Sequence, residues 1–569
     1  MHRFDIASRT VLDALQTGQI GTAVAVRVVA HLTADHGPLE RFNARIMEAT
    51  GTWLKSRPER LTAMGNVEAG QISTLNRFVG GQTALVSVGT IGMGQPLLEI
   101  VVWGNRGILS WEAGDRFTPT TDRLQEPKLS EHAQNLLRQV RSSLATGGSV
   151  EFAKRPADAV PRPADPIHLP LRADRAVPRR PKAQAPPYGV LLVAGDHTHQ
   201  PGYARALAAD KRCRLIGLTD EADVTPRRKR LNAQLADRLG IPFLPNLQQA
   251  LHREDVQIVS ICAEPARRGR IVVQAAKAGK HLYLDKPLAG SLRDADDIQT
   301  AVTEAGVVNH MWSQVRSDVA FRMRQTVQSG QLGELTAFHA DLCFAKGPAG
   351  TASLDKPRQE TPVPQRYELT DSKRELSNVG VYPLVSLLWL TGRKVRRVAA
   401  TTGNYFFKEH QQNNMEDFGQ MLLELDGGLV ASISVGRTGW RSYRSGGLNR
   451  TCLIGTKETV VFDAHRPRIA LWADVEPWTA PQRDPEDPMG MWGTPKTEEF
   501  TPRPRQSWTL PAGLPRTSDV AYFLDCIEQG RESDALATLA AAATEVLLAG
   551  YHSAATGTLV KLPLPRKTQ

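Results

Sequence analysis

The sequence lacks the apolar segments that would place it in or across a membrane. No stretch offers about 18 uninterrupted apolar residues for a membrane-spanning helix, and the residues up to Asp13 contain no apolar core of a signal peptide. These absences predict a globular, cytoplasmic protein. Its 569 residues and 41% hydrophobic content are enough for three or four domains with cores of their own.

Cysteine is scarce and follows no pattern. The 5 cysteines are widely separated and include no C-x-x-C pair, which argues against a disulfide framework, a zinc site or a redox dithiol. Two histidines alternate in "DHTHQ" at 196–200, but no further His or Cys stands nearby at helical ligand spacing. A metal cofactor is therefore not expected.

Aromatic residues are missing from the basic runs. The net charge of +11 and the pI of about 9.5 would suit a nucleic-acid partner. However, the densest basic runs, at 161–187, 227–230 and 267–270, contain no interleaved aromatic side chains. We expect a solvated basic surface, or recognition of small phosphorylated molecules by the two short runs, and no nucleic-acid partner.

Composition and periodicity divide the chain into four parts. Nine prolines fall between Ala153 and Pro187 and predict an extended linker at 154–187. Short apolar runs alternate with helical patterns over 188–308, which predicts a Rossmann-like, doubly wound parallel sheet. Alternating strands joined by turns follow over 309–569 and predict an α+β domain with a mainly antiparallel open sheet.

An internal repeat accounts for the beginning of the chain. "TGQIGTAVAVRVVAHL" (17–32) parallels "SGQLGELTAFHADLCF" (329–344), and "FVGGQTALVSVG" (78–89) parallels "LDGGLVASISVG" (425–436). Further short matches occur in the same order. We therefore expect residues 1–153 to be a second copy of the antiparallel domain.

One motif carries a resemblance to a known family. "AAKAGKHLYLDKPLAGSLRDADDI" (275–298) resembles the signature of the Gfo/Idh/MocA family (glucose-fructose oxidoreductase and inositol dehydrogenase), and "SGQLGEL" and "YHSAATGTLVKLPL" resemble that family too. The resemblance implies an NAD(P)-dependent dehydrogenase or reductase that acts on a carbinol of a sugar, cyclitol or polyol. It also implies an open sheet that faces the substrate and mediates oligomerisation. Lys286 stands at the position of the family's lysine.

A second signature supplies two more candidate catalytic residues. The family's D-x-G-x-H/Y helix is similar to "SNVGVYPLVSLLWLTG" (377–392), with Tyr382 at the His/Tyr position and Asn378 in place of the acid. Hydride leaves a C–H bond readily only if the neighbouring hydroxyl loses its proton, so the site needs a base and a cation. We expect Tyr382 to exchange the proton, with Lys286 close enough to make a phenol useful near neutral pH.

The glycine turn that normally binds a dinucleotide is altered. Only Gly195 of the G-x-G-x-x-G pattern remains, with His197 and Gln200 at the other two places. Asp220, at the end of the second strand, favours NAD over NADP because a carboxylate accepts from a ribose 2′-hydroxyl, although the nearby "RRKR" argues for NADP. The full expectation for the cofactor site is Gly195, His197, Thr198, Asp220, Glu264, Pro265 and Lys286, and for the substrate site Arg268, Arg316 and Tyr382.

Two other functions fit the same resemblance. One is a glycoside-processing enzyme whose tightly bound NAD is recycled internally, and the other is a non-catalytic ligand-binding or assembly protein. In the N-terminal repeat Ile46 stands where Tyr382 stands in the second copy, so that copy is expected to be non-catalytic. It would supply in cis the sheet that a second subunit supplies elsewhere, so the expected assembly is a homo-oligomer or an intramolecular pseudo-dimer. The segments 345–375 and 462–516 are expected to line or cover the pocket.

Overall fold

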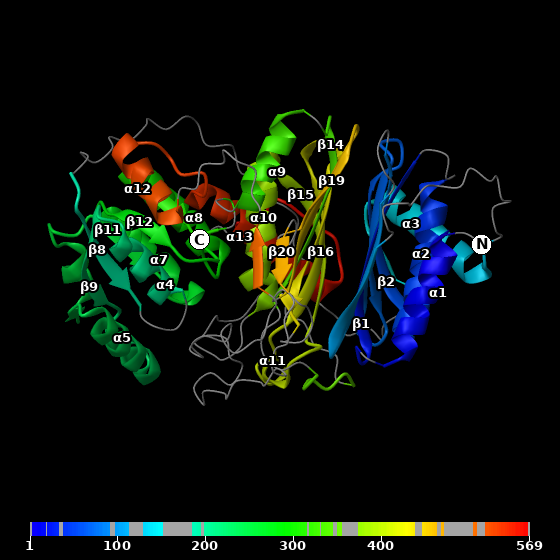
Figure 1. The fold of residues 1–569 in the computed structure, drawn as a ribbon, viewed down its shortest axis with the longest axis horizontal. Helices are drawn as coiled ribbons and strands as arrows, with labels where there is room; N and C mark the ends of the chain where they lie inside the picture. Colours follow the sequence, from blue (N-terminus) through cyan, green and yellow to red (C-terminus); the bar gives the residue numbers. More distant parts are fainter. Residues whose placement is uncertain are drawn as a thin grey trace.

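Three large β-sheets follow one another along the chain (Figure 1). The computed structural model describes residues 3–566 except for 19, 34–37, 92–96, 113–128, 152–184, 195–198, 314, 316–317, 331, 345–349, 356–373, 439–446, 464–467, 472–504 and 509–517. Most of the expected linker and of the segments 345–375 and 462–516 lies outside the described residues. Within the described part of the chain, no helix combines the length and the apolar character needed to cross a bilayer.

The first sheet has seven strands in the order β6-β5-β1-β4-β3-β2-β7. Its pairs are antiparallel except for β1 with β4. Helices α1, α2 and α3 lie along the outer face of the sheet (Figure 1). The elements are α1 (Arg3–Gln16), β1 (Ala23–Thr33), α2 (Leu39–Leu54), β2 (Pro58–Asn66), β3 (Gln71–Phe78), β4 (Thr83–Ile91), β5 (Leu97–Gly104), β6 (Gly107–Glu112), α3 (Glu131–Thr146) and β7 (Ser149–Glu151).

The second sheet has six strands in the order β10-β9-β8-β11-β12-β13, all parallel. It is the Rossmann-like sheet that the alternating pattern predicted. Its strands are β8 (Tyr188–Val193), β9 (Cys213–Thr219), β10 (Phe243–Leu244), β11 (Ile258–Ile261), β12 (His281–Leu284) and β13 (Asn309–Met311). Its helices are α4 (Gln200–Ala209), α5 (Pro226–Leu239), α6 (Leu247–Leu251), α7 (Pro265–Lys277) and α8 (Leu292–Ala305).

The parallel sheet extends past the predicted boundary at residue 308. Strand β13 pairs with β12 as its sixth strand, although three residues are too short to give a periodic signal. A later helix, α12 (Asp519–Gln529), also packs on this sheet: its Phe523 shares a hydrophobic core with Tyr188 and Leu192 of β8. The chain thus returns to the Rossmann-like part before it adds α13 (Ala537–Thr556) and β22 (Val560–Lys561), the last strand of the third sheet.

The third sheet repeats the strand order of the first. It runs β19-β18-β14-β17-β16-β15-β22, again with one parallel pair, β14 with β17. A small two-stranded sheet, β20 (Arg468–Leu471) with β21 (Arg505–Trp508), lies apart from it. The remaining elements are α9 (Asp318–Gln328), β14 (Leu335–Phe344), α10 (Glu375–Thr391), β15 (Val395–Gly403), α11 (Lys408–Gln412), β16 (Phe418–Leu425), η2 (Asp426–Gly428), β17 (Val430–Arg437), β18 (Gly447–Gly455), β19 (Thr459–Asp463), α13 (Ala537–Thr556) and β22 (Val560–Lys561).

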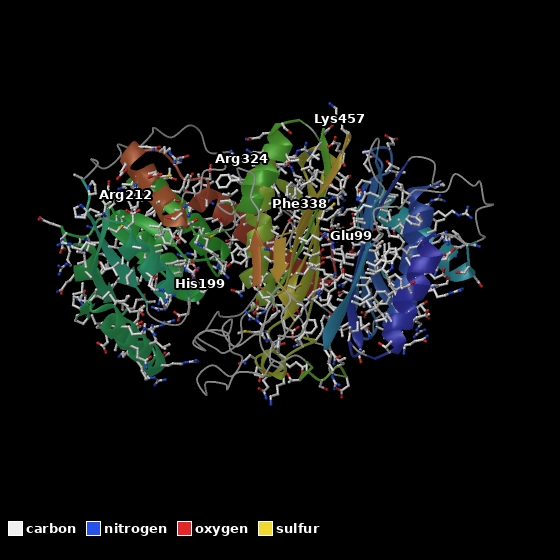
Figure 2. The ribbon with its side chains drawn as sticks, in the orientation of Figure 1. Glu99, His199, Arg212, Arg324, Phe338 and Lys457 are labelled. Carbon is white, nitrogen blue, oxygen red and sulfur yellow. The ribbon has the colours of Figure 1, made fainter. Side chains whose placement is uncertain are left out.

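The first and third sheets face each other, with helices on their outer sides (Figure 1). Because both faces of each sheet are covered, central strands such as β17 are buried along their whole length, where an alternating burial pattern would mark one solvated face. In the interface the Arg27 Nε atom lies 2.9 Å from Asp341 Oδ1, and the Trp103 and Phe418 rings are 5.1 Å apart. Glu99, labelled between the sheets in Figure 2, forms an ion pair across the interface with Arg450 of β18.

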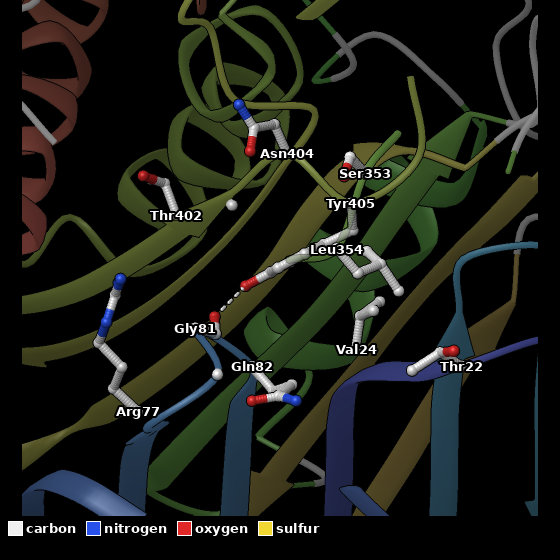
Figure 3. A pocket seen from close by; sticks show the side chains of 12 residues that line it. Thr22, Val24, Arg77, Gly81, Gln82, Ser353, Leu354, Thr402, Asn404 and Tyr405 are labelled. Atoms are coloured by element: carbon white, nitrogen blue, oxygen red, sulfur yellow. Dashed lines mark hydrogen bonds between the residues drawn. The ribbon is translucent and has the colours of Figure 1, made fainter. Parts of the chain in front are cut away.

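A cavity lies at one end of this interface (Figure 3). The first sheet contributes Arg77 and the turn around Gly81, and the third contributes Thr402 and Asn404. The Tyr405 hydroxyl donates a hydrogen bond of 2.6 Å to the Gly81 carbonyl and fastens the two parts together beside the cavity.

Candidate functional site

The candidate site lies where the parallel sheet meets helix α10. Lys286 follows β12 at its carboxyl end, and its side chain is only 5% exposed. The Lys286 Nζ atom donates to the backbone oxygen and to the side-chain Oδ1 of Asn378, both at 2.7 Å. It also lies 4.8 Å from the centre of the Tyr382 ring. The structure therefore brings together the three residues that the sequence motifs selected as catalytic.

Helix α10 presents Asn378 and Tyr382 on one face because the two residues are four positions apart. The helix is buried almost all round, from Glu375 to Leu388, because it packs between the third sheet and α13. Strongly apolar residues on every face, as in "VGVYPLVSLLWL", are typical of such a helix. Asn378 and Tyr382 are thereby held in fixed positions beside Lys286.

Burial changes the acid–base role expected of Lys286. Removal from water lowers the pKa of its ammonium to about 8, although the negative charges of Asp285 and Glu375 oppose that shift. The positive charges of Arg268 and Arg437 lower the pKa further. An amine with a pKa of about 8 can exchange its proton close to neutral pH.

Tyr382 does not have the lowered pKa that the sequence analysis expected. Burial raises the pKa of its phenol well above the usual value, and the charges of Asp285 and Glu375 raise it further. Lys286 is close to Tyr382, but its ammonium lies over the ring face and does not bond to the hydroxyl oxygen. Trp312 packs against the ring edge-on at 5.6 Å. Tyr382 is therefore a neutral hydrogen-bonding group near pH 7.

Asp285, next to Lys286, is the centre of a second polar cluster. The His199 Nδ1 atom lies 2.8 Å from its Oδ1, and the Tyr203 hydroxyl donates to the same oxygen at 3.0 Å. Burial would raise the pKa of Asp285, but the charges of His199, Arg268 and Lys286 hold it below its usual value. Figure 2 shows His199 on the side of the parallel sheet that faces the third-sheet domain.

Arg268, an expected substrate-site residue, is buried and bonded to the backbone around Lys286. Its side chain is 1% exposed, its Nε donates to the Ala263 oxygen, and its Nη1 donates to the backbone oxygens of Asp285 and Pro287. The guanidinium thus clamps the chain on either side of Lys286. The assignment of Arg268 to the substrate site stays a prediction.

The end of β9 holds the carboxylate expected to read the cofactor ribose. Asp220 is 1% exposed and accepts from the Arg267 guanidinium and from Asn232 Nδ2, the latter at 2.8 Å. Arg267 also pairs with Glu264 at the start of α7, and Glu264 pairs with Arg228 of α5. The cations hold the pKa of Glu264 at about 2, against the effect of burial. These ion pairs extend between the ends of β9 and β11.

The described residues fit a dinucleotide at the level of the fold. Strand β8 lies between β9 and β11, where the strand order reverses, and α4 begins just beyond its carboxyl end with His199 as N-cap. A helix N-terminus and a basic side chain are suitable partners for phosphate. The ribose-reading carboxylate, in contrast, is already bound to Arg267, so a ribose hydroxyl must compete with that ion pair.

Several expected site residues receive no structural account. Gly195, His197, Thr198 and Arg316 lie outside the described residues. Pro265 is described, and it is the first residue of α7, a position where a missing N–H costs no hydrogen bond. Among the described residues, no group of three or more His, Cys, Asp or Glu is arranged to hold a metal ion.

Sequence analysis did not select Glu375 or His199 as site residues. Glu375 begins α10 and lies one turn before Asn378, a helical spacing that a search for polar side chains on the motif face would have found. His199 belongs to the "DHTHQ" stretch, and its link to Asp285 joins residues 86 positions apart. No local pattern predicts such a contact.

Two family models match the chain in the regions that form this site. Residues 195–312 match the "Oxidoreductase family, NAD-binding Rossmann fold", and residues 321–461 match the "GFO/IDH/MocA C-terminal domain". The first match identifies the cofactor of the parallel-sheet domain as NAD.

Individual proteins give more distant similarities. A dTDP-3,4-didehydro-2,6-dideoxy-alpha-D-glucose 3-reductase of Streptomyces antibioticus is 22% identical over 42% of this chain and 68% of its own length. A 1,5-anhydro-D-fructose reductase of Ensifer adhaerens is 32% identical over 17% of this chain and 30% of its own length. The crystal structure of GenD2 from gentamicin A biosynthesis, in complex with NAD, covers 68% of this chain and 100% of its own, with 22% identity and a TM-score of 0.48.

The matched regions contain the motif lysine, the α10 helix and most strands of the two sheets that surround them. In residues 195–312 and 321–461, the chain belongs to the Gfo/Idh/MocA family of NAD-binding oxidoreductases.

Proposed function

We propose that the protein transfers a hydride between a nicotinamide cofactor and a carbinol carbon of a sugar, cyclitol or related polyol. The observation that carries the proposal is the buried Lys286 amine, held by Asn378 beside the Tyr382 ring at the carboxyl end of β12. Ligands of doubly wound folds bind at this end of the sheet. The names of the two reductase relatives, which act on sugar derivatives, support the substrate class.

The acid–base part of the reaction is assigned to Lys286. In the oxidising direction its neutral amine takes the proton of the substrate hydroxyl while the C–H bond breaks, the hydride leaves with its electron pair and a carbonyl forms. NAD, when bound, supplies the hydride acceptor. In the reducing direction the Lys286 ammonium returns the proton to the nascent alkoxide. A pKa of about 8 suits both directions, because both forms of the amine are present near neutral pH.

Asn378 and Tyr382 orient the reacting groups. Asn378 accepts two hydrogen bonds from Lys286 through its backbone and side-chain oxygens and so fixes the direction of the amine. Tyr382 stays neutral and is assigned the role of hydrogen-bond donor to the substrate oxygen. The α4 N-terminus, His199 and Asp220 are assigned to hold the cofactor.

Binding and turnover of the purified full-length chain test this function. Isothermal calorimetry with NAD, NADH, NADP and NADPH is expected to detect binding, and spectrophotometry at the NADH absorbance is expected to detect reduction or oxidation with a panel of sugars, nucleotide sugars and cyclitols. Absence of binding to all four nucleotides would contradict the proposal. Cofactor that stays bound through turnover without net reduction would instead favour internal recycling.

We also propose that residues 1–153 are a second copy of the third-sheet domain and that they cover its sheet in cis. The identical strand order supports this, and so does the register: Ala25 is opposite Thr83 in the first sheet, and Ala337 is opposite Val430 in the third. These pairs correspond in the two matching sequence stretches. Ile46, the counterpart of Tyr382, is fully buried in the core of the first part.

The in cis arrangement makes a prediction about mass. The full chain is expected to behave as a single 62.4 kDa protomer in multi-angle light scattering, because the third sheet is already covered. A chain that lacks residues 1–153 would expose that sheet and is expected to dimerise or aggregate. If it kept the same protomer state, solubility and activity, the proposed role of the first sheet would be wrong.

A further inference from the structure

Glu375 is a buried carboxylate one helical turn before Asn378. Its side chain is fully buried, and its Oε2 accepts a hydrogen bond of 2.9 Å from Asn378 Nδ2. Asn378 itself accepts from Lys286 through Oδ1. The three side chains therefore form a continuous line from the carboxylate through the amide to the amine.

The surroundings of Glu375 keep it negatively charged. Arg437 of β17 donates from Nε to Glu375 Oε1 at 3.0 Å, and His410 Nε2 of α11 lies 3.7 Å from the same oxygen. Burial would raise the pKa of Glu375, but Arg437, His410 and Asn378 hold it below its usual value. Asp417 is a further charged neighbour of His410. A charged carboxylate is thus built into the helix at the site.

Only one orientation of the Asn378 side-chain amide satisfies both of its neighbours. An amide has an acceptor oxygen and a donor nitrogen. Because Glu375 binds the nitrogen end, the oxygen end faces the Lys286 amine. A flipped amide would turn N–H groups toward an ammonium and an oxygen toward a carboxylate, and both contacts would be repulsive.

We propose that Glu375 is a positioning residue for Lys286: it fixes the Asn378 amide and supplies, through that amide, the negative charge that an acid at position 378 would supply directly. The inference rests on the proposed reaction for its catalytic meaning, but its physical content is the coupling of Glu375 to Lys286. Within the described part of the chain, the other charged or aromatic groups that face Lys286 are Asp285 just after β12, Arg268 of α7, Arg437 of β17 and the Tyr382 ring.

The proposal is tested by moving the carboxylate from position 375 to position 378. Glu375→Gln removes the carboxylate, and the double change Glu375→Gln with Asn378→Asp places one carboxylate next to Lys286. The single change is expected to lower kcat about 10- to 100-fold, the loss expected for a hydrogen bond to a charged group. The double change is expected to restore most of that loss. Glu99→Gln is the matched control, because Glu99 is also buried and paired with an arginine, Arg450, but lies in the sheet interface.

A second readout does not depend on turnover. The titration of Lys286 is followed by NMR of the 13Cε resonance in the full-length protein labelled at lysine, with the signal assigned from Lys286→Met. Since an opposite charge favours the ammonium, Glu375→Gln is expected to lower the midpoint by about one pH unit, and the double change to raise it again. If Glu375→Gln changes the Lys286 titration midpoint and kcat no more than Glu99→Gln does, the proposal is wrong.

These experiments distinguish the proposed hydride transfer from the proposed coupling of Glu375 to Lys286. If the unmodified protein shows no redox turnover but Glu375→Gln still shifts the Lys286 midpoint, the proposed reaction fails and the coupling stands. If Glu375→Gln does not fold, Glu375→Asp keeps the charge near Arg437 and withdraws it from Asn378 by one methylene. That variant is expected to lower kcat with little change in KM, and unchanged kcat would overturn the positioning role.

Discussion

The Lys286 Nζ atom is 2.7 Å from the Oδ1 atom of Asn378 and 2.7 Å from the backbone oxygen of the same residue. One residue of α10 thus provides two oxygens to the amine, and both come from a helix that is buried almost throughout. The amine is held away from water and has no direct carboxylate partner among the described residues. Under this condition burial lowers the pKa of a lysine.

Replacing Lys286 by methionine is expected to abolish turnover and to preserve the fold. Methionine fills a similar volume and removes the only group of the described site that is assigned to exchange the proton. General acid–base catalysis contributes about 10²- to 10⁴-fold, so kcat is expected to fall by at least that factor. Circular dichroism and calorimetric NAD binding serve as controls. Full activity would remove Lys286 from the mechanism.

The Tyr382→Phe substitution isolates the hydroxyl group. Phenylalanine keeps the ring beneath the Lys286 ammonium and the edge contact with Trp312, so packing and the charge–ring contact remain. A lower kcat with an unchanged pH dependence is expected, because the hydroxyl acts as a donor and does not titrate. A displaced pH profile would show that Tyr382 exchanges the proton after all.

The pH dependence of the reaction is expected to follow the Lys286 amine. Burial lowers its pKa to about 8. Oxidation needs the neutral amine, so its kcat should rise as the pH increases through about 8, whereas reduction needs the ammonium and should fall over the same range. Initial rates in both directions between pH 6 and 10 provide the measurement. Parallel profiles in the two directions would contradict the assignment.

Cofactor selectivity is expected to depend on Arg267. Its guanidinium binds Asp220 and offsets the negative charge at the end of β9. Arg267→Gln would free Asp220 to accept from a ribose 2′-hydroxyl and would remove a cation from the place where a 2′-phosphate would lie. The ratio of the NADP to the NAD dissociation constant, measured by calorimetry, should therefore rise. Arg253→Gln, in an exposed ion pair with Asp255, is the control.

Removing one partner of the buried Arg27–Asp341 ion pair is expected to destabilise the protein more than removing both. Arg27→Met leaves Asp341 buried and without its partner guanidinium, at a cost of about 3–5 kcal/mol in the free energy of unfolding. The double change Arg27→Met with Asp341→Leu removes both charges and should recover most of that stability. The midpoint of the first transition in guanidinium chloride measures both effects. Equal midpoints for the single and double variants would contradict this role.

Sequence and structure agree best where the determinants are local. The strand-end position of Lys286 and the four-residue spacing of Asn378 and Tyr382 are properties of short segments, and they placed all three residues at one site. The phenol's raised pKa depends on burial by Trp312 and on charges from other elements, which no single segment contains.

The arginines show the same limit in another way. Arg268 belongs to a basic run that looks solvated in sequence, but it folds back onto the backbone oxygens of Ala263, Asp285 and Pro287. Arg437 reaches Glu375 only because β17 runs beside α10. In both cases tertiary structure determines the partner. The sequence therefore predicts the fold class but not these contacts.

The contact of Arg27 with Asp341 also bears on how this interface can change over evolution. In the matching stretches 17–32 and 329–344, Arg27 corresponds to His339 and Asp341 to Val29. Under the duplication proposed above, the symmetry-related contact would join a histidine and a valine. Two identical subunits related by a twofold axis must carry each substitution on both sides at once. Covalent linkage of two different sheets removes that constraint, and one side can gain a charge while the other gains its counter-charge. The asymmetry of the Arg27–Asp341 pair is a form of specialisation that a symmetric dimer cannot adopt.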